Sequence, residues 1–161
     1  MRDSGDRERS FVIRQLESCD TDLMAEAVVQ LKPESRSLPI SSETCRPFLA
    51  DRRNVFALAT EDGAAIGYAV AYVLSRVDRE VPMVLLYEVE VHPEHRRRGV
   101  GRSLVDHIRE ISREVGASKM WTLTDEANRA ARTLYESAGG IDAGESLLIA
   151  WSEERLGDDD G

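Results

Sequence analysis

The stretch Glu94-His95-Arg96-Arg97-Arg98-Gly99-Val100-Gly101-Arg102 joins two segments with different hydrophobic patterns and decides how the fold is built. An apolar run, residues 85–91, precedes it, and an amphipathic run, residues 100–115, follows it. This order predicts a strand, a tight turn and then a helix. The first N–H groups of a helix lack intrahelical partners, and the helix dipole favours negative charge beside them. Because glycine lets a phosphate approach the backbone closely, the stretch predicts an anion site.

The pattern Arg96-x-x-Gly99-x-Gly101 differs from two other phosphate-binding motifs. It lacks the Lys-Ser/Thr ending of a P-loop and the G-x-G-x-x-G spacing of a dinucleotide fingerprint. Backbone donors in residues 97–103 suit a pyrophosphate, and the arginine side chains suit a further phosphate at its rim. The alternative is a solvated basic cap, which the helix dipole opposes because the cations then lie at its positive end.

The composition bounds the class of protein. A chain of 161 residues, 42% hydrophobic and 32% charged, is typical of one soluble globular domain. It has no apolar run near the ~18 residues that a membrane span needs, and residues 1–10 lack the apolar core of a secretory signal. Cys19 and Cys45 have no metal or redox spacing, so we expect a cytoplasmic location. The net charge of −9 argues against nucleic-acid binding and suits a cationic substrate or simply solubility.

The remaining pattern predicts an α/β (α+β) fold, a mixed sheet flanked by helices, in a single domain over residues 1–161 with disordered ends at 1–9 and 153–161. We expect strands at 11–16, 55–60, 66–74, 83–91, 119–123 and 146–151, and helices at 21–31, from Ser41 or Ser42 onward, at 100–115, and from within 125–128 to Gly139. A hairpin turn is expected at 61–63 and a loop at 32–40.

Two carboxylates lie in the strand before the arginine-rich turn. Regular pleating places Glu88 and Glu90 on one face about 7 Å apart, with Leu86 beside them and Tyr87 on the opposite face. Two acids beside a pocket can hold an ammonium group and accept its proton. The alternative is an exposed or salt-bridged strand face, and a β-bulge would break the alternation.

The last predicted helix carries Asn128, Ala131 and Tyr135 along one face. The small residue between two polar ones leaves room for a ligand, to which Tyr135 can present its hydroxyl. The alternative is a tyrosine of the hydrophobic core. The three histidines have no partner at ligand spacing, so no metal site is predicted.

Together these motifs resemble the GNAT superfamily of acetyl-CoA-dependent N-acetyltransferases over residues 85–139. The arginine-rich turn is similar to the family's pyrophosphate loop, and Asn128-x-x-Ala131-x-x-x-Tyr135-x-x-x-Gly139 is similar to its second cofactor motif. Residues 68–74, 87–91 and 95–97 resemble the type I aminoglycoside 3-N-acetyltransferases. The resemblance implies a GNAT-type sheet whose strands splay apart to admit the cofactor.

The resemblance also implies roles for individual residues. Glu88 binds the amine and accepts its proton, directly or through a water, and Tyr135 protonates the departing thiolate. Asp125 and Glu126 are further acidic contacts to the substrate. Acetyl-CoA is the cosubstrate, no metal is needed, and the cofactor-binding residues are Val89, Glu90, Val91, Arg96, Arg97, Arg98, Gly99, Val100, Gly101, Arg102, Ser103, Asn128, Ala131 and Tyr135.

Three functions are consistent with these motifs. The first is acetylation of an aminoglycoside antibiotic at a primary amine, by resemblance the 3-amino group, which confers resistance. The second is acetylation of a peptide N-terminus, a lysine or a small polyamine. The third belongs to another class, a non-catalytic acetyl-CoA-binding module that binds the cofactor without turnover. The expected partner is a small cationic amine, with neither nucleic acid nor membrane, and the resemblance suggests a homodimer.

Overall fold

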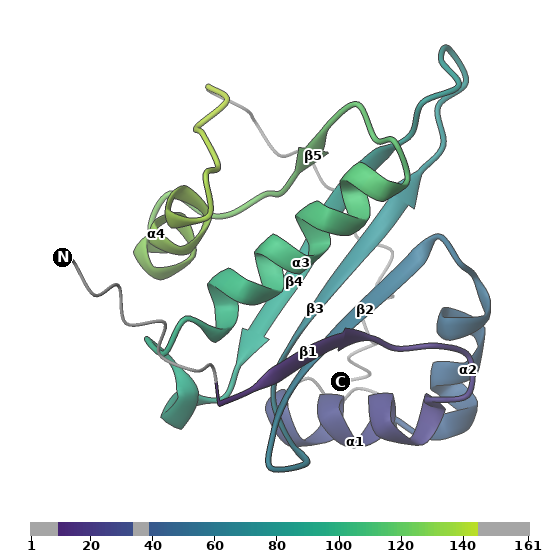
Figure 1. The fold of residues 1–161 in the computed structure, drawn as a ribbon, viewed down its shortest axis with the longest axis vertical. Coiled ribbons are helices and arrows are strands. Elements are labelled where there is room, and N and C mark those ends of the chain that lie inside the picture. The colour runs from purple at the N-terminus through teal and green to yellow at the C-terminus, as the bar shows by residue number, and fades with distance from the viewer. Residues whose placement is uncertain (1–9, 34–38, 145–161) are drawn as a thin grey trace, which may run out of the picture.

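The structure, a computed structural model, describes residues 10–33 and 39–144. Within these residues one sheet has the order β1-β2-β3-β4-β5 (Figure 1). Neighbouring strands are antiparallel except for β4 and β5, which are parallel, so the predicted mixed sheet of an α+β fold is confirmed. The elements are β1 (Val12–Gln15), α1 (Thr21–Leu31), α2 (Ser42–Ala50), β2 (Asn54–Glu61), β3 (Ala64–Leu74), β4 (Met83–Val91), η1 (Pro93–His95), α3 (Val100–Glu114), β5 (Met120–Trp121) and α4 (Arg129–Ser137).

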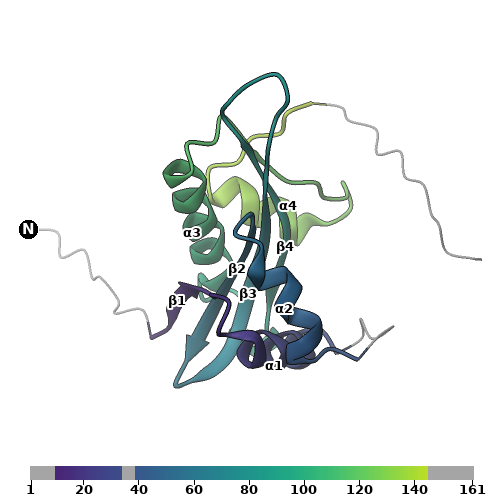
Figure 2. The same cartoon turned by 90° about the vertical axis from the view of Figure 1, so that its right-hand side faces the viewer.

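Helices cover both faces of the sheet and bury a separate core on each. Helix α3 lies over one face, and α1 and α2 lie over the other (Figure 2). Strand β2 supplies both cores because successive side chains point to opposite faces: Val55 packs beneath α3, and Phe56 packs beneath α1 and α2. The amphipathic run predicted at 100–115 is confirmed at Leu104 and Ile108, which are fully buried there, but its last residue, Val115, is exposed. This helix ends one residue earlier than predicted, with Val115 as its C-cap.

Strands β4 and β5 are paired over a very short length. Val84 lies opposite Met120 and Leu85 lies opposite Trp121. The predicted strand at 119–123 is therefore confirmed only at residues 120–121. Along residues 86–91, β4 has no strand partner on its β5 side among the described residues. Among the described residues, this edge of β4 is therefore unpaired, and it faces the side on which α4 lies (Figure 1).

Strand β4 contains a β-bulge at Tyr87. Val70 of β3 lies opposite Glu88, whereas the next residue of β3, Ala71, lies opposite Leu86. The prediction of regular pleating is therefore wrong at this point, because one extra residue reverses the alternation. Leu86 is buried beneath α3, while Tyr87 contacts the ring of Tyr72 on the opposite face.

Glu88 and Glu90 share a face, as predicted. Their partners in β3 are Val70 and Tyr68, and both of these belong to the core beneath α1 and α2. The two acids therefore face α1, whose C-cap is Lys32.

Several predictions lie outside the described residues. They are the last strand at 146–151, the ends at 1–9 and 153–161, and residues 34–38 of the predicted loop. Helix α2 does begin at Ser42, with Ser41 and Thr44 forming a capping box. In the described part of the chain, no helix combines the length and hydropathy needed to cross a membrane.

Candidate active site

The arginine-rich turn opens α3 with its first backbone donors uncovered. Gly99 is the N-cap and has a left-handed conformation with φ of 83°, which glycine adopts without steric cost. The first intrahelical bond runs from the N–H of Ser103 to the carbonyl of Gly99, at 2.9 Å. The N–H groups of residues 100–102 therefore precede the hydrogen-bonded part of the helix and can bind an anion.

Gly101 lets α4 approach this turn closely. A Cβ atom at Gly101 would lie 3.3 Å from both terminal methyl groups of Leu134 and 3.6 Å from a methyl group of Val91. The start of α3, the end of β4 and the middle of α4 therefore converge at one point. These are three of the segments from which the predicted cofactor-binding residues come.

One arginine of the turn is fixed by an internal ion pair. Arg98 donates to both carboxylate oxygens of Glu61, at 2.6 and 3.0 Å, and to the hydroxyl of Ser10. The Ser10 hydroxyl in turn donates to Glu61, and the hydrogen bonds from Arg98, first, and from Ser10, second, hold the pKa of Glu61 at about 2. His95 Nε2 lies 3.2 Å from the same carboxylate. Arg98 therefore joins the turn to the β2–β3 hairpin, and its backbone is the part open to a ligand.

The other arginines are bound less tightly. Arg96 donates to the carbonyl of Val91 at 3.1 Å and lies 3.7 Å from Glu90. Arg102 lies 3.8 Å from Asp106, one helical turn further along. Arg97 is exposed, has φ of 62° and forms no ion pair with a described residue. Its guanidinium is consequently the most available positive charge of the turn.

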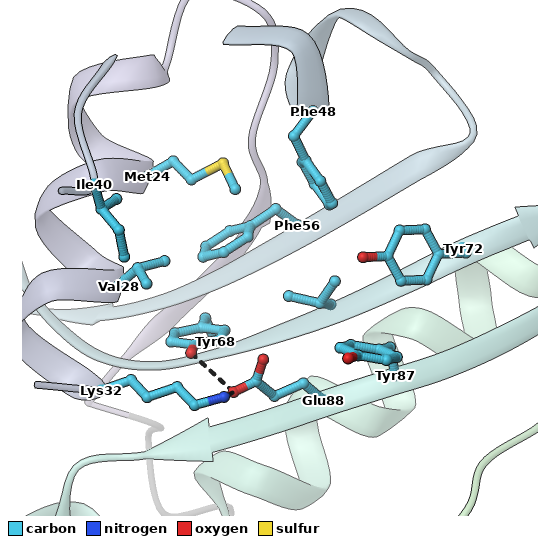
Figure 3. Close-up of a pocket in the computed structure, with 11 residues that line it drawn as sticks. Met24, Val28, Lys32, Ile40, Phe48, Phe56, Tyr68, Tyr72, Tyr87 and Glu88 are labelled. Carbon is cyan, nitrogen blue, oxygen red and sulfur yellow. Dashed lines mark hydrogen bonds and ion pairs between the residues drawn. The ribbon is translucent and has the colours of Figure 1, made fainter. Parts of the chain in front are cut away.

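A cavity of about 230 Å³ lies beneath α1 and α2, on the face of the sheet opposite to α3 (Figure 3). Its walls are mostly apolar and aromatic, and Glu88 is the one acidic residue among the described residues that line it. The lining residues are Met24, Val28, Lys32, Ile40, Phe48, Phe56, Tyr68, Val70, Tyr72, Tyr87 and Glu88.

Glu88 has two partners in this cavity. Lys32 Nζ lies 2.5 Å from Glu88 Oε1, and the Tyr68 hydroxyl donates to the same oxygen at 3.1 Å (Figure 3). Tyr68 is only 1% exposed. Burial raises its pKa far above the ordinary value, and the charge of Glu88 adds to this effect. The tyrosine therefore remains a hydrogen-bond donor to the carboxylate.

Three aromatic rings form the wall of the cavity beyond Glu88. Tyr72 packs edge to face against Phe48 and Tyr87, with ring centroids 6.0 and 5.5 Å apart. Tyr87 is 63% exposed, so the wall reaches the surface. The bulge produces this arrangement, because it turns Tyr87 and Glu88 toward the same face. An acceptor can thus place an amine at Glu88 and an apolar group against the rings.

The predicted residues of the last helix lie apart from this cavity. Asn128 is the N-cap of α4, and its side chain accepts a hydrogen bond from the N–H of Ala131 at 3.1 Å. Tyr135 is half-buried against the core beneath α3. Asp125 and Glu126 are exposed in the turn before α4 and do not line the cavity. The structure therefore does not bring these two acids together with Glu88.

Lys32, Tyr68 and Tyr72 line the cavity although no sequence motif predicts a role for them. Lys32 and Glu88 are 56 positions apart, and such a pairing leaves no local pattern in the sequence. In the described part of the chain, no three histidine, cysteine, aspartate or glutamate side chains gather as metal ligands would.

Residues 17–140 match the acetyltransferase (GNAT) family, and the chain belongs to that family. It is 28% identical over 119 residues to the [ribosomal protein bS18]-alanine N-acetyltransferase of Escherichia coli strain K12, covering 74% of each protein. It is 25% identical over 111 residues to human N-acetyltransferase 8, covering 69% of this chain and 49% of that protein. The chain therefore spans about half the length of this second relative.

The fold is also that of solved acetyltransferases. An aminoglycoside acetyltransferase from an uncultured soil metagenomic sample, in complex with trehalose, superposes with a TM-score of 0.81 at 19% identity. The comparison covers 90% of this chain and 97% of that chain. This comparison shows the GNAT fold, and the family match together with the Escherichia coli relative makes the domain an acetyl-CoA-dependent N-acetyltransferase.

The residues present fit the cosubstrate of this family. Acetyl-CoA joins a pyrophosphate to a long amide-containing arm that ends in a thioester. The first N–H groups of α3 suit the pyrophosphate, and the unpaired edge of β4 offers backbone groups to amides. Nothing lies within 4 Å of the place where a Cβ atom of Gly99 would stand, so the approach to this end of α3 is open.

Proposed function

We propose that this domain acetylates a primary amine held at Glu88, and that its acceptor joins a single ammonium group to an apolar or aromatic body. The observation that carries the proposal is the cavity beneath α1 and α2, where one carboxylate lies among apolar and aromatic side chains. A hydrophobic wall with one negatively charged group favours an acceptor that has an apolar body and one positively charged group.

Glu88 prepares the amine for attack. An alkylammonium ion is not a nucleophile, so a proton must leave before the nitrogen can attack the thioester carbonyl. Glu88 accepts this proton directly or through a water. The hydroxyl of Tyr68 holds the carboxylate in place at 3.1 Å. The acceptor takes over the place at Glu88 that the Lys32 ammonium occupies in the structure.

Backbone and side-chain donors complete the transfer. The N–H of Val89 belongs to the unpaired part of β4 and is the proposed donor to the carbonyl oxygen as negative charge develops there. Tyr135 is the proposed donor of a proton to the leaving sulfur. The transfer is direct, and neither cysteine lines the cavity as a nucleophile would. The proposed cofactor residues are those of the arginine-rich turn, residues 89–91 of β4, and Asn128, Ala131 and Tyr135.

The single carboxylate favours a peptide amine over a polycation. Lys32 already balances the charge of Glu88, and Asp125 and Glu126 do not line the cavity. A peptide N-terminus with a small apolar first residue offers one ammonium and an apolar side chain. The name of the bacterial relative, a ribosomal-protein alanine N-acetyltransferase, agrees with such an acceptor.

A second candidate acceptor is an aminoglycoside, acetylated at its 3-amino group. The observation in its favour is Glu90, which shares a face with Glu88. Its carboxylate lies 3.7 Å from the Arg96 guanidinium, which is a loose ion pair. Two carboxylates on one strand face can hold two ammonium groups of one polycation. Aminoglycoside acetyltransferases also have this fold.

A panel of amines with acetyl-CoA tests these alternatives, with CoA release as the measurement. The panel contains peptides that begin with alanine, lysine peptides whose N-terminus is blocked, polyamines and aminoglycosides. We expect the highest kcat/KM for the alanine peptides. Higher values for aminoglycosides would favour the second candidate. Binding of acetyl-CoA without turnover of any amine would indicate a non-catalytic module.

Glu88→Gln and Glu90→Gln form a matched pair for the same panel. We expect Glu88→Gln to lower kcat for every accepted amine by about 10²-fold, the usual contribution of a general base. Activity should partly return at high pH, where more of the amine is already neutral. Glu90→Gln should raise KM for polycations only if the second candidate is right.

A further inference from the structure

Lysine is rare in this protein, and one of its lysines lies in the acceptor cavity. The chain has 21 lysine and arginine residues, and only Lys32 and Lys119 are lysines. Arginine supplies the positive charges of the arginine-rich turn and the cation in most ion pairs of the described residues. An arginine does not release its proton in a protein, whereas a lysine can do so and then act as a nucleophile.

Lys32 occupies the position proposed for the amine of the acceptor. It follows the last residue of α1, and its side chain extends along β4 to Glu88 (Figure 3). The Lys32 ammonium donates a charge-assisted hydrogen bond to Glu88, with Nζ 2.5 Å from Oε1. The Lys32 side chain is 38% exposed, so it is neither sealed in the core nor free in solvent.

We propose that Lys32 is a site of self-acetylation, at which the domain acetylates its own chain from acetyl-CoA. This inference rests on the proposed role of Glu88 as the group that accepts a proton from the amine. The same contact that would hold an acceptor holds Lys32, and the residue type is one that acetylation can modify.

The reaction balances with groups that are already named. The Lys32 ammonium loses one proton to Glu88, which passes it to solvent. Its nitrogen attacks the thioester carbonyl, a C–N bond forms, and the C–S bond breaks. The thiolate that leaves takes a proton from Tyr135, and the second proton lost by Lys32 restores that tyrosine through solvent. Lys32 then carries a neutral amide and no longer forms an ion pair with Glu88.

Mass spectrometry of the two lysines tests the proposal. The full chain is incubated with acetyl-CoA and no acceptor, and acetylation at Lys32 and Lys119 is followed with time. Lys119 is exposed, immediately precedes β5 and does not line the cavity, so it reports spontaneous acetylation. We expect Lys32 to react on the order of 10²-fold faster, the contribution of a positioned base. Its rate per molecule should not change with protein concentration.

Variants separate enzymatic from spontaneous acetylation. Lys32→Arg keeps the positive charge but should abolish the fast reaction, and Lys119→Arg should leave it unchanged. Glu88→Gln should slow acetylation of Lys32 to the rate seen at Lys119. Without acetyl-CoA, an amine-reactive acetylating reagent should label Lys32 faster in Glu88→Gln than in the wild type, because the ion pair no longer holds the ammonium.

Five outcomes would overturn the inference. Equal acetylation of Lys32 and Lys119 would assign both to spontaneous chemistry. A rate that rises with protein concentration would assign the transfer to collisions between molecules. Equal labelling of Lys32 in the wild type and in Glu88→Gln would show that the ion pair does not control this amine. If the amine panel is turned over while Lys32 stays unmodified, self-acetylation is wrong and the proposed function stands; if neither reacts, both fail.

Discussion

Two neighbouring arginines have different environments and should have different roles. Arg97 is exposed and forms no ion pair with a described residue, whereas Arg98 donates to Glu61 through both terminal nitrogens of its guanidinium. We expect Arg97→Gln to weaken CoA binding about tenfold, the loss of roughly one charge-assisted hydrogen bond, with an unchanged Tm. Arg98→Gln should instead lower the Tm at neutral pH. Calorimetric titration with CoA and thermal unfolding measure the two effects.

Arg97→Gln and Arg98→Gln serve as controls for each other, since each variant removes one positive charge from the same turn. If both variants weaken CoA binding equally without a change in Tm, the turn acts through its total charge. In that case the ion pair with Glu61 has no separate structural role.

Tyr135 is the proposed proton donor to sulfur, and its hydroxyl is the only group that Tyr135→Phe removes. We expect this variant to lower kcat by about 10²-fold, the usual contribution of a general acid, with little change in the KM for acetyl-CoA. Tyr87→Phe removes a hydroxyl from the acceptor cavity and serves as the matched control, whose kcat should be nearly that of the wild type. Steady-state kinetics with thiol detection measures both. Unchanged turnover in Tyr135→Phe would mean that the sulfur takes its proton from another source.

At the scale of elements, Glu61 joins the end of the β2–β3 hairpin to the turn that opens α3. Its pKa is lowered from 4.5 to about 2, so the folded state binds this proton less readily than the unfolded state. The stability that this contact contributes is present above pH 4.5 and is lost as the pH falls through 2. We expect Glu61→Gln to lower the Tm at pH 7 and to converge with the wild type near pH 2.

Thermal unfolding between pH 7 and pH 2 measures this difference. Glu114→Gln, at the exposed end of α3, is the control and should follow the wild-type profile. A constant difference between Glu61→Gln and the wild type over the whole pH range would contradict the role of the ion pair.

The elements were predictable wherever the pattern is local and regular. The spacing of Val100, Leu104 and Ile108 predicts α3, and the glycines before it predict the turn. Regular alternation fails at Tyr87, because a bulge is an insertion relative to the partner strand, and one strand alone does not show its register. Strand β5 ends at Trp121 because it separates from β4 there. Such a separation depends on two segments far apart in the sequence, so the pattern of one segment does not show it.

The same rule separates the two sides of the candidate site. The arginine-rich turn and the helix that carries Tyr135 are local motifs, so a resemblance can indicate them, and their roles stay predictions. The acceptor cavity is assembled from α1, α2, β3 and β4, and its ion pair joins Lys32 to Glu88 across 56 positions. Asp125 is close to the motif residues in sequence but lies in an exposed turn. Proximity along the chain therefore does not indicate which side chains line this cavity.

At the scale of the molecule, the two halves of the site lie on different sides of the sheet. The arginine-rich turn opens α3, above one core, and the cavity at Glu88 lies beneath α1 and α2, above the other core. Strand β4 is common to both, and its unpaired edge lies between them. Changes in the aromatic wall should therefore alter the choice of acceptor without altering the affinity for acetyl-CoA.

Binding of CoA should stabilise the domain against unfolding, and this stabilisation should have two contributions that can be measured separately. At about 100 times its Kd, CoA adds about 2.7 kcal/mol to the free energy of unfolding, which is roughly 5–10 °C in Tm for a domain of this size. ADP should give part of this shift through the start of α3, and pantetheine should give another part through the edge of β4. Arg97→Gln should reduce the shift with ADP and leave that with pantetheine unchanged. Differential scanning calorimetry measures each shift. If pantetheine alone reproduces the full effect of CoA, the arginine-rich turn is a solvated basic cap.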